Sequence, residues 1–226
     1  MANPDREIRR LLASPEQAKR LQAIRPEIRA EVIPAAEIGR MLPPGAVHQG
    51  AAISTPLLDG LSIDELAEGE GGVILVLDQV TDPQNVGAIF RSAAAFGARG
   101  VVLQDRHAPP LAGALAKAAA GAVEQVPHAR VVNLSRALER LTDHGWRAVG
   151  LDGEAEASIA DALSGPRIVL VLGSEGEGLR RLVSEHCDVL AHIPMPGGFE
   201  SLNVSAAAAV ALYEASRGRS APPSGE

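Results

Sequence analysis

From residue 72 onward, short runs of apolar and β-branched residues alternate with segments of helical periodicity. The apolar runs are residues 73–77, 101–103, 148–151, 168–172 and 189–193. The helical patterns are near residues 84–97, 110–120, 133–144, 178–185 and 202–217. Continuous apolar strands separated by helices are typical of a parallel sheet covered by helices on both faces. The sequence therefore predicts an α/β fold for this part of the chain.

The first 55 residues have a different pattern, which indicates a small separate α+β domain. Short helices are expected near residues 5–12, 15–24 and 34–41, and weak strands near residues 31–33 and 51–54. Residues 56–71 contain turn residues, acids and one short helical pattern at 63–67, so we interpret them as a linker. The predicted units are residues 1–55, the linker 56–71, the α/β domain 72–218 and a flexible Ser/Pro/Gly-rich tail at 219–226.

Composition excludes several classes of protein. The chain has 226 residues, of which 46% are hydrophobic, enough for a buried core. No apolar stretch approaches the ~20 residues of a membrane helix, and the N-terminus lacks a secretory h-region, so we expect a cytoplasmic protein without a membrane partner. The single cysteine, Cys187, excludes an internal disulfide and a thiolate zinc cluster. The six histidines share no ligand spacing, and we predict no metal site.

Charge leaves a nucleic-acid partner open. The net charge is −7, but residues 1–30 carry a net +3, so the remainder carries −10. Of the 21 basic residues, 19 are arginines, which contact phosphates with two parallel hydrogen bonds. A local basic face can bind RNA on an acidic molecule. The alternative is a solvated helix face without a partner.

The segment 77–103 begins with a strand end and a well-defined helix start. Asp82 is a good N-cap, and Pro83 occupies the first helical position, where its missing N–H is harmless. Asn85 falls in the first turn and Arg91 six residues later. Both are expected at the helix margins near the carboxyl edge of the sheet, where open α/β sheets bind ligands. The alternative for Arg91 is an ordinary surface arginine.

The segment 168–182 joins an apolar strand to a glycine-rich loop at residues 173–178. Its three glycines allow sharp turns and a close approach to a ligand. No Gly-Lys-Ser/Thr follows, so it is not a phosphate P-loop, and it also differs from the dinucleotide pattern G-x-G-x-x-G. Its carboxylates, Glu175 and Glu177, suit a ligand with positive charge or hydroxyl donors. A plain strand–helix turn is the alternative.

The segment 192–217 leads from a short strand through a Pro/Gly loop into an alanine-rich helix. Ser201 or Asn203 is expected to cap this helix. The small residues at 206–209 allow another element to pack closely. Capping alone is the alternative to a ligand role, and both roles are compatible.

Together these segments resemble the three ordered motifs of the SpoU (TrmH-type) RNA ribose methyltransferases of the SPOUT superfamily. The pattern N-x-G-x-x-x-R is met by Asn85, Gly87 and Arg91, the pattern G-x-E-G-x-G by Gly173, Glu175, Gly176 and Gly178, and I-P-M…S-L-N-V-S by residues 193–195 and 201–205. The resemblance covers about residues 47–217. One motif alone is weak, but three in order are specific.

The resemblance implies a parallel sheet with a C-terminal trefoil knot, a homodimer, and S-adenosylmethionine as cofactor. His48-Gln49-Gly50 and Lys117 with Gly121-Ala122 are similar to the subgroup that methylates a guanosine of 23S ribosomal RNA. That subgroup has an N-terminal L30e-like RNA-binding domain. Here the opening strand and helix of that domain are expected to be absent, so the domain is partial. Ala119 stands where relatives often have serine.

The resemblance also implies roles for individual residues. Arg91 is expected to stabilise negative charge on the ribose oxygen, Asn85 and Glu175 to orient the arginine and the ribose, and Ser201 and Asn203 to fix the target nucleotide. The cofactor is expected against Leu172, Gly173, Ile193, Met195 and Leu202, with Leu151 and Gly153 from an adjacent strand end. No metal is required.

Three alternatives remain at this point. A non-catalytic RNA-binding or ribosome-assembly factor would be expected to lose Arg91 or the Ser201–Asn203 pair, which are present. A nucleotide-dependent oxidoreductase would need a glycine fingerprint after the first strand, where the sequence is instead DQVTDP. A tRNA ribose methyltransferase of the same superfamily differs mainly outside the knot.

Overall fold

The computed structural model describes residues 6–198 and 201–217. The chain divides into two compact units, Met1–Leu58 and Asp59–Glu226, which we describe separately. The tail that the sequence predicts at 219–226 lies outside the described residues. None of the described helices combines the length and hydropathy needed to cross a bilayer.

The first unit is a three-stranded sheet with two helices. In chain order it contains β1 (Arg10–Ala13), α1 (Pro15–Ile24), β2 (Glu31–Val32), α2 (Ala35–Met41) and β3 (Ala51–Ser54). The sheet order is β2-β1-β3, with β1 parallel to β2 and antiparallel to β3.

The prediction of a helix near residues 5–12 is wrong, because residues 10–13 form the central strand β1. Leu11, Leu12 and Ala13 are buried in the unit's small core, and burial against two neighbouring strands outweighs local helix propensity. Helix α1 begins only after Ser14, whose hydroxyl accepts a hydrogen bond from the Gln17 N–H.

The second unit contains a seven-stranded sheet whose pairings are all parallel, which confirms the predicted α/β class. The strands are β4 (Gly72–Leu77), β5 (Gly100–Gln104), β6 (His128–Val131), β7 (Arg147–Leu151), β8 (Ala157–Ser158), β9 (Arg167–Leu172) and β10 (Val189–His192). Their order in the sheet is β6-β5-β4-β9-β7-β10-β8. Strands β6 and β8 escape prediction because they are short edge segments without a continuous apolar run.

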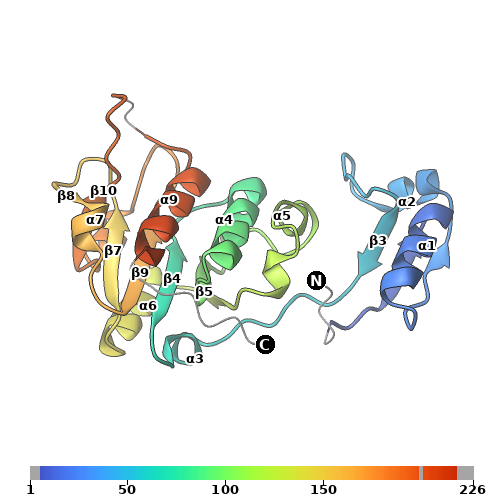
Figure 1. Cartoon of the computed structure of the whole chain (residues 1–226), viewed down its shortest axis with the longest axis horizontal. Helices are drawn as coiled ribbons and strands as arrows, with labels where there is room; N and C mark the ends of the chain where they lie inside the picture. Colours follow the sequence, from blue (N-terminus) through green and yellow to red (C-terminus); the bar gives the residue numbers. More distant parts are fainter. Residues whose placement is uncertain (1–5, 199–200, 218–226) are drawn as a thin grey trace. The chain divides into compact units, whose positions relative to one another are not determined.

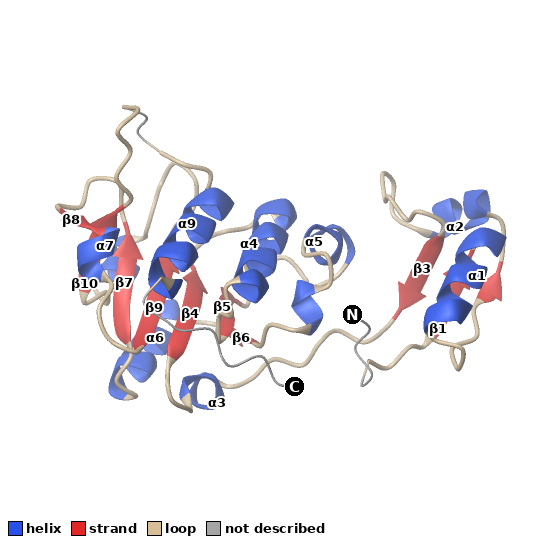
Figure 2. Cartoon of the chain, viewed as in Figure 1, coloured by secondary structure: helices blue, strands red, loops and turns tan. Residues whose placement is uncertain are grey.

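Helices cover both faces of this sheet (Figures 1 and 2). On one face, α4 (Pro83–Ala95) packs between α5 (Gly113–Ala118) and α9 (Val204–Ser216). On the other, α6 (Leu134–Asp143) packs against α3 (Ile63–Ala67) and α8 (Arg181–Ser184). A 3₁₀ turn, η1 (Ala122–Glu124), follows α5, and α7 (Ile159–Ala162) contacts β10 and α9.

The core on the α6 side is built from alternate strand residues. Ile74, Val102 and Val169 pack there with Leu138 and Trp146. Trp146 is almost fully buried, and its indole N–H donates to the Ala67 carbonyl at 3.1 Å. This bond satisfies the one polar group of the ring, so the large side chain can lie in the core.

The connections of the sheet reverse direction between β4 and β9. From β4 the chain adds β5 and β6 on one side, whereas β9 returns to lie between β4 and β7. The carboxyl ends of β4 and β9 therefore border a topological switch point, which is the general ligand-binding position in open α/β sheets. The glycine-rich loop at 173–178 begins at this position.

Candidate active site

The N-terminus of α4 brings the first candidate residue to this edge. The Asp82 carboxylate accepts hydrogen bonds from the N–H groups of Gln84 (3.1 Å) and Asn85 (3.4 Å), and Pro83 opens the helix. The predicted N-cap is confirmed. Because the cap fixes the first turn, it also fixes where the Asn85 side chain projects.

The loop after β9 closes on itself. The N–H groups of Ser174 and Gly178 each donate to the other residue's carbonyl, at 3.1 and 3.0 Å. A Cβ at Gly173 would lie 2.1 Å from the Gly178 carbonyl carbon and 2.4 Å from the Leu179 nitrogen. The sequence predicts that Gly173 leaves room for a ligand, but the loop's own backbone occupies that side. Gly178 has φ of 66°, so the predicted helix at 178–185 begins only at Arg181.

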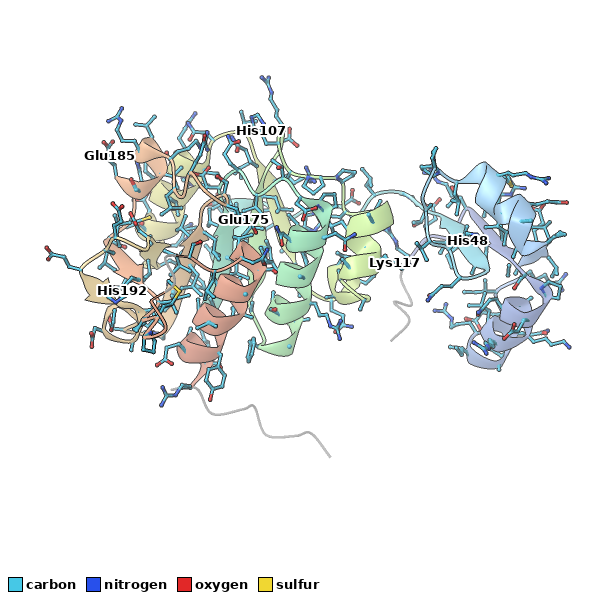
Figure 3. The ribbon with its side chains drawn as sticks, turned by 90° about the horizontal axis from the view of Figure 1, so that it is seen from above. His48, His107, Lys117, Glu175, Glu185 and His192 are labelled. Atoms are coloured by element: carbon cyan, nitrogen blue, oxygen red, sulfur yellow. The ribbon has the colours of Figure 1, made fainter. Side chains whose placement is uncertain are left out.

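Glu175 joins the three sequence motifs. Its Oε1 accepts hydrogen bonds from Asn85 Nδ2 (3.1 Å), Asn203 Nδ2 (2.5 Å) and the Val204 N–H (3.3 Å). Asn203 Nδ2 also donates to Asn85 Oδ1 at 3.0 Å. We call these three side chains the Asn85–Glu175–Asn203 cluster. Figure 3 shows Glu175 beside the ends of α4 and α9.

Asn203 has a second role as the N-cap of α9. Its Oδ1 accepts from the N–H groups of Ser205 (3.0 Å) and Ala206 (3.4 Å) and from the Ser205 hydroxyl (2.6 Å). Of the two predicted caps, Asn203 is therefore the one used. Ser201 is exposed and has no hydrogen bond to the described residues, so the structure does not bring it into the cluster.

Arg91 lies away from the cluster within this chain. It is six residues beyond Asn85, which corresponds to about 9 Å along the helix and about 120° around it. Its side chain is exposed and makes no hydrogen bond or ion pair with the residues that the structure describes. Arg91 is thus a cation on the surface of α4 that is unpaired within the described part of the chain.

The residues expected to hold a cofactor gather at one edge of the sheet. Leu151, Leu172 and Ile193 stand at the carboxyl ends of β7, β9 and β10, which are neighbours in the order β9-β7-β10. Gly153 and Met195 follow two of these strands, and Leu202 precedes α9. The backbone N–H groups of Met195 and Leu202 have no hydrogen-bond partner among the described residues. Free donors beside apolar side chains suit a ligand with a heteroaromatic ring.

Sequence reasoning missed an ion pair at the switch point, between buried Asp78 and the partly exposed Arg180. Asp78, directly after β4, is fully buried, and its Oδ1 accepts from Arg180 Nε at 2.7 Å. Its Oδ2 accepts from the Arg180 N–H at 2.9 Å, and its own N–H donates to the Leu172 carbonyl at 2.8 Å. Asp78 thereby ties the far end of the glycine-rich loop to the sheet. The signal was an acid directly after a fully apolar strand.

Two other chemistries find little support in the described part of the chain. It contains no group of three or more His, Cys, Asp or Glu side chains that could hold a metal ion. Burial raises the pKa of the Cys187 thiol to about 12. Because thiolate is the nucleophilic form, this cysteine is unsuited to nucleophilic catalysis.

The cluster gives a first testable prediction. Glu175→Ala removes three hydrogen bonds and leaves the Asn85 amide and the Val204 N–H without this acceptor, while Asn203 Nδ2 keeps Asn85 Oδ1. We therefore expect the free energy of unfolding to fall by about 1 kcal/mol in chemical denaturation. The matched control is Glu177→Ala, an exposed glutamate of the same loop without a hydrogen bond to the described residues, which should change stability by less than ~0.5 kcal/mol. Equal stabilities for the two variants would show that the cluster contributes nothing to the fold.

Comparisons with known proteins agree with this geometry. Residues 72–213 match the model of the SpoU rRNA Methylase family. A protein of Mycobacterium avium, described as an uncharacterized tRNA/rRNA methyltransferase, is 40% identical over 191 residues, which are 83% of this chain and 62% of that protein. The chain thus spans about three fifths of the length of this relative.

Two further relatives are informative. The 23S rRNA (guanosine-2′-O-)-methyltransferase RlmB of Ralstonia nicotianae is 46% identical over 180 residues, covering 78% of this chain and 72% of that protein. The crystal structure of the SpoU methyltransferase AviRb from Streptomyces viridochromogenes in complex with AdoMet has a TM-score of 0.78 and 27% identity, covering 95% of this chain and 84% of that one.

Proposed function

Since the chain belongs to the SpoU rRNA methylase family, we propose that it transfers a methyl group from S-adenosylmethionine to a ribose 2′-oxygen in RNA. The observation that carries this proposal is the Asn85–Glu175–Asn203 cluster, which joins all three family motifs at the carboxyl edge of the sheet. The activity named for the Ralstonia relative supports a guanosine of 23S ribosomal RNA as the target. A tRNA ribose is the second candidate, because the name of the Mycobacterium relative includes tRNA.

The cofactor-binding residues would be Leu172, Gly173, Ile193, Met195 and Leu202, with Leu151 and Gly153. The N–H groups of Met195 and Leu202, which are unpaired within the described residues, and the apolar strand ends fit an adenine ring and its ribose. When bound, S-adenosylmethionine supplies an electron-poor methyl carbon beside its sulfonium. The residues of this chain then have to hold the RNA hydroxyl in line with that carbon, which can lower a barrier by roughly 7–11 kcal/mol in the best cases.

A ribose hydroxyl is a poor nucleophile at neutral pH, so the site has to stabilise negative charge on its oxygen. Arg91 is the group proposed for this task, as a fixed cation that pairs with the oxygen or a neighbouring phosphate. Guanidinium groups stay protonated in proteins, so a phosphate oxygen or water is the better proton acceptor. Asn85 and Glu175 would orient the ribose, and Ser201 and Asn203 the target nucleotide.

A homodimer would bring Arg91 to a complete site. Within one chain Arg91 is remote from the cluster, whereas the adjoining surface of α9 exposes Val210 (41%) and Tyr213 (56%). Tyr213 packs edge-on against Phe96 with ring centroids 6.1 Å apart, which extends the apolar surface beyond α9. A second copy on this face would bury these side chains. Arg91 would then act on the cofactor pocket of the partner subunit.

The two units of the chain would have different roles in this function. Residues 1–55 would be a partial L30e-like RNA-binding domain, residues 56–71 a linker, residues 72–218 the methyltransferase domain with its C-terminal trefoil knot, and residues 219–226 a flexible tail. The bonds from Asn203 to the loop after β9 support a close passage of the last segment past this loop. The proposed location is the cytoplasm, where ribosomal RNA is available.

Mass mapping of RNA tests the function directly. Ribosomal and transfer RNA from cells lacking the gene, with and without complementation, should differ by one ribose 2′-O-methyl group. We expect the lost group on a 23S guanosine, whereas loss from a tRNA would favour the second candidate. Identical methylation in both strains would contradict the proposal. Purified protein and labelled S-adenosylmethionine should restore the group on RNA from the deletion strain.

A further inference from the structure

A hollow lies at the carboxyl ends of β5 and β6, on the same edge of the sheet as the proposed active site. Its volume is about 450 Å³, and it is bounded by the end of β5, the start of α6 and the residues around α8. The residues important here are Gln104, Val132, Asn133, Arg180, Arg181 and Leu182. The proposed roles of the three motifs involve none of them.

Gln104 is the unusual member of this wall. It is the last residue of β5, only 8% exposed, and its Oε1 has no hydrogen-bond partner among the described residues. A buried unpaired acceptor costs about 1–3 kcal/mol in a folded protein. A carboxamide can accept and donate at once, so it can recognise the paired donor and acceptor on the edge of a nucleobase.

The rim of the hollow carries two arginines, and each is paired with a carboxylate, Arg180 with buried Asp78 and Arg181 with Glu185. Arg181 is exposed and its ion pair with Glu185 (2.7 Å) spans one helical turn at the surface. Exposed pairs of this kind contribute little to stability, so a phosphate of a bound nucleotide could compete with Glu185 for Arg181. Asn133 caps α6, whose ten residues direct the positive end of their dipole to the same place.

The walls are suited to a flat ring. Val132 is 70% exposed and Leu182 56%, and they line the hollow from the β6–α6 connection and from α8. Enzymes that act on a base outside the stack read it by hydrogen bonds at its edge and by contact with aromatic or apolar side chains.

The hollow also lies close to the proposed active site, and the loop after β9 contributes residues to both. The end of β5 is two strands from the end of β9, or roughly 10 Å at the usual strand spacing. The loop after β9 holds Glu175 in the cluster at one end and Arg180 at the hollow at the other, where buried Asp78 fixes it. Neighbouring nucleotides of one RNA strand can span such a distance.

We propose that this hollow binds the base and phosphate of a nucleotide next to the methylated one, with Gln104 at the base edge and Arg181 at the phosphate. This inference rests on the proposed function, because it names part of the RNA that the same site would recognise. It predicts a contribution to RNA binding that is separate from cofactor binding.

Gln104→Leu tests the inference, with Gln125→Leu as the matched control. Gln125 is exposed at the end of η1 and does not line the hollow. Binding of a fluorescein-labelled single-stranded RNA of mixed sequence is measured by anisotropy, and cofactor binding by calorimetry. We expect Gln104→Leu to weaken RNA binding about tenfold, the effect of one lost hydrogen bond in a desolvated site, while cofactor affinity and the control stay within twofold.

A second variant protects the test against a folding defect at buried Gln104. Val132→Trp changes an exposed residue and fills the hollow from its rim, so it should also weaken RNA binding about tenfold with an unchanged circular dichroism spectrum. Arg181→Gln should reduce the slope of log affinity against log salt by about one phosphate contact. RNA affinities within twofold of wild type for both Gln104→Leu and Val132→Trp would overturn the inference.

The outcomes also separate the two proposals. If the wild type transfers methyl groups and both variants bind RNA normally, the hollow is not an RNA site and the proposed function stands. If the wild type transfers none but the variants lose RNA affinity, the RNA site stands and the proposed reaction fails.

Discussion

Arg91→Ala is expected to lower the rate of methyl transfer at least ~100-fold, the scale of a lost charge-stabilising donor. The affinity for S-adenosylmethionine should stay within about twofold of wild type. The physical reason is that Arg91 pairs with no described residue, so its removal leaves the fold and the cofactor pocket intact. Single-turnover transfer and a calorimetric titration measure the two quantities. Equal single-turnover rates would refute the role.

The matched control is Arg147→Ala. Arg147 is also an exposed arginine, but it begins β7 at the opposite edge of the sheet. Its removal takes away one positive charge, as Arg91→Ala does, but at a position remote from the proposed site. A similar loss in both variants would indicate a general weakening of RNA attraction, whereas a loss confined to Arg91→Ala indicates a role in transfer.

A mixing experiment decides whether Arg91 acts within its own subunit or across a dimer. If the chain forms the proposed homodimer, Arg91→Ala and Gly173→Val chains that are refolded together would give mixed dimers. If Arg91 serves the partner's pocket, each mixed dimer has one intact pocket facing one intact arginine, and activity returns. If Arg91 serves its own chain, each mixed dimer has no complete site and activity stays absent.

The local part of the site could be predicted from the sequence, because adjacent residues determine it. The start of α4 depends on Asp82 and Pro83, which are neighbours, and the prediction is confirmed. The strand β1 was predicted wrongly, because Leu11 and Leu12 are buried by β2 and β3 from elsewhere in the chain. Tertiary burial decided this element against its local preference.

The long-range contacts needed either a family pattern or the structure. The motifs of Asn85 and Asn203 are 118 residues apart, and the resemblance alone placed both in one site. The pairing of Asp78 with Arg180 is outside the motif pattern, and no periodicity indicates it. The role proposed for Gln104 could not be predicted from the sequence either, because the sequence indicates only the end of a buried strand. The fold places this residue beside α6 and α8.

Gly173→Val is expected to abolish measurable cofactor binding, for a reason that only the structure supplies. The new side chain would meet the Gly178 and Leu179 backbone at 2.1–2.4 Å, where real Cβ atoms do not occur. The bond between Ser174 and Gly178 would have to break, and Glu175 would move away from Asn85.

We therefore expect two coupled losses in Gly173→Val. Unfolding should require at least ~3 kcal/mol less than in the wild type, the upper range for overpacking a closed site, and calorimetry should detect no binding of S-adenosylmethionine. If the valine variant does not fold, Gly173→Ala can replace it, because alanine already has the Cβ that meets the loop backbone. Its stability and its affinity for S-adenosylmethionine should both fall. Gly165→Ala is the control, because its Cβ meets open space and only its φ of 89° is strained, at about 1–3 kcal/mol. Unchanged cofactor affinity in a folded Gly173→Val protein would mean that the loop after β9 can rearrange without disturbing the pocket, and the cluster would then not define the cofactor site.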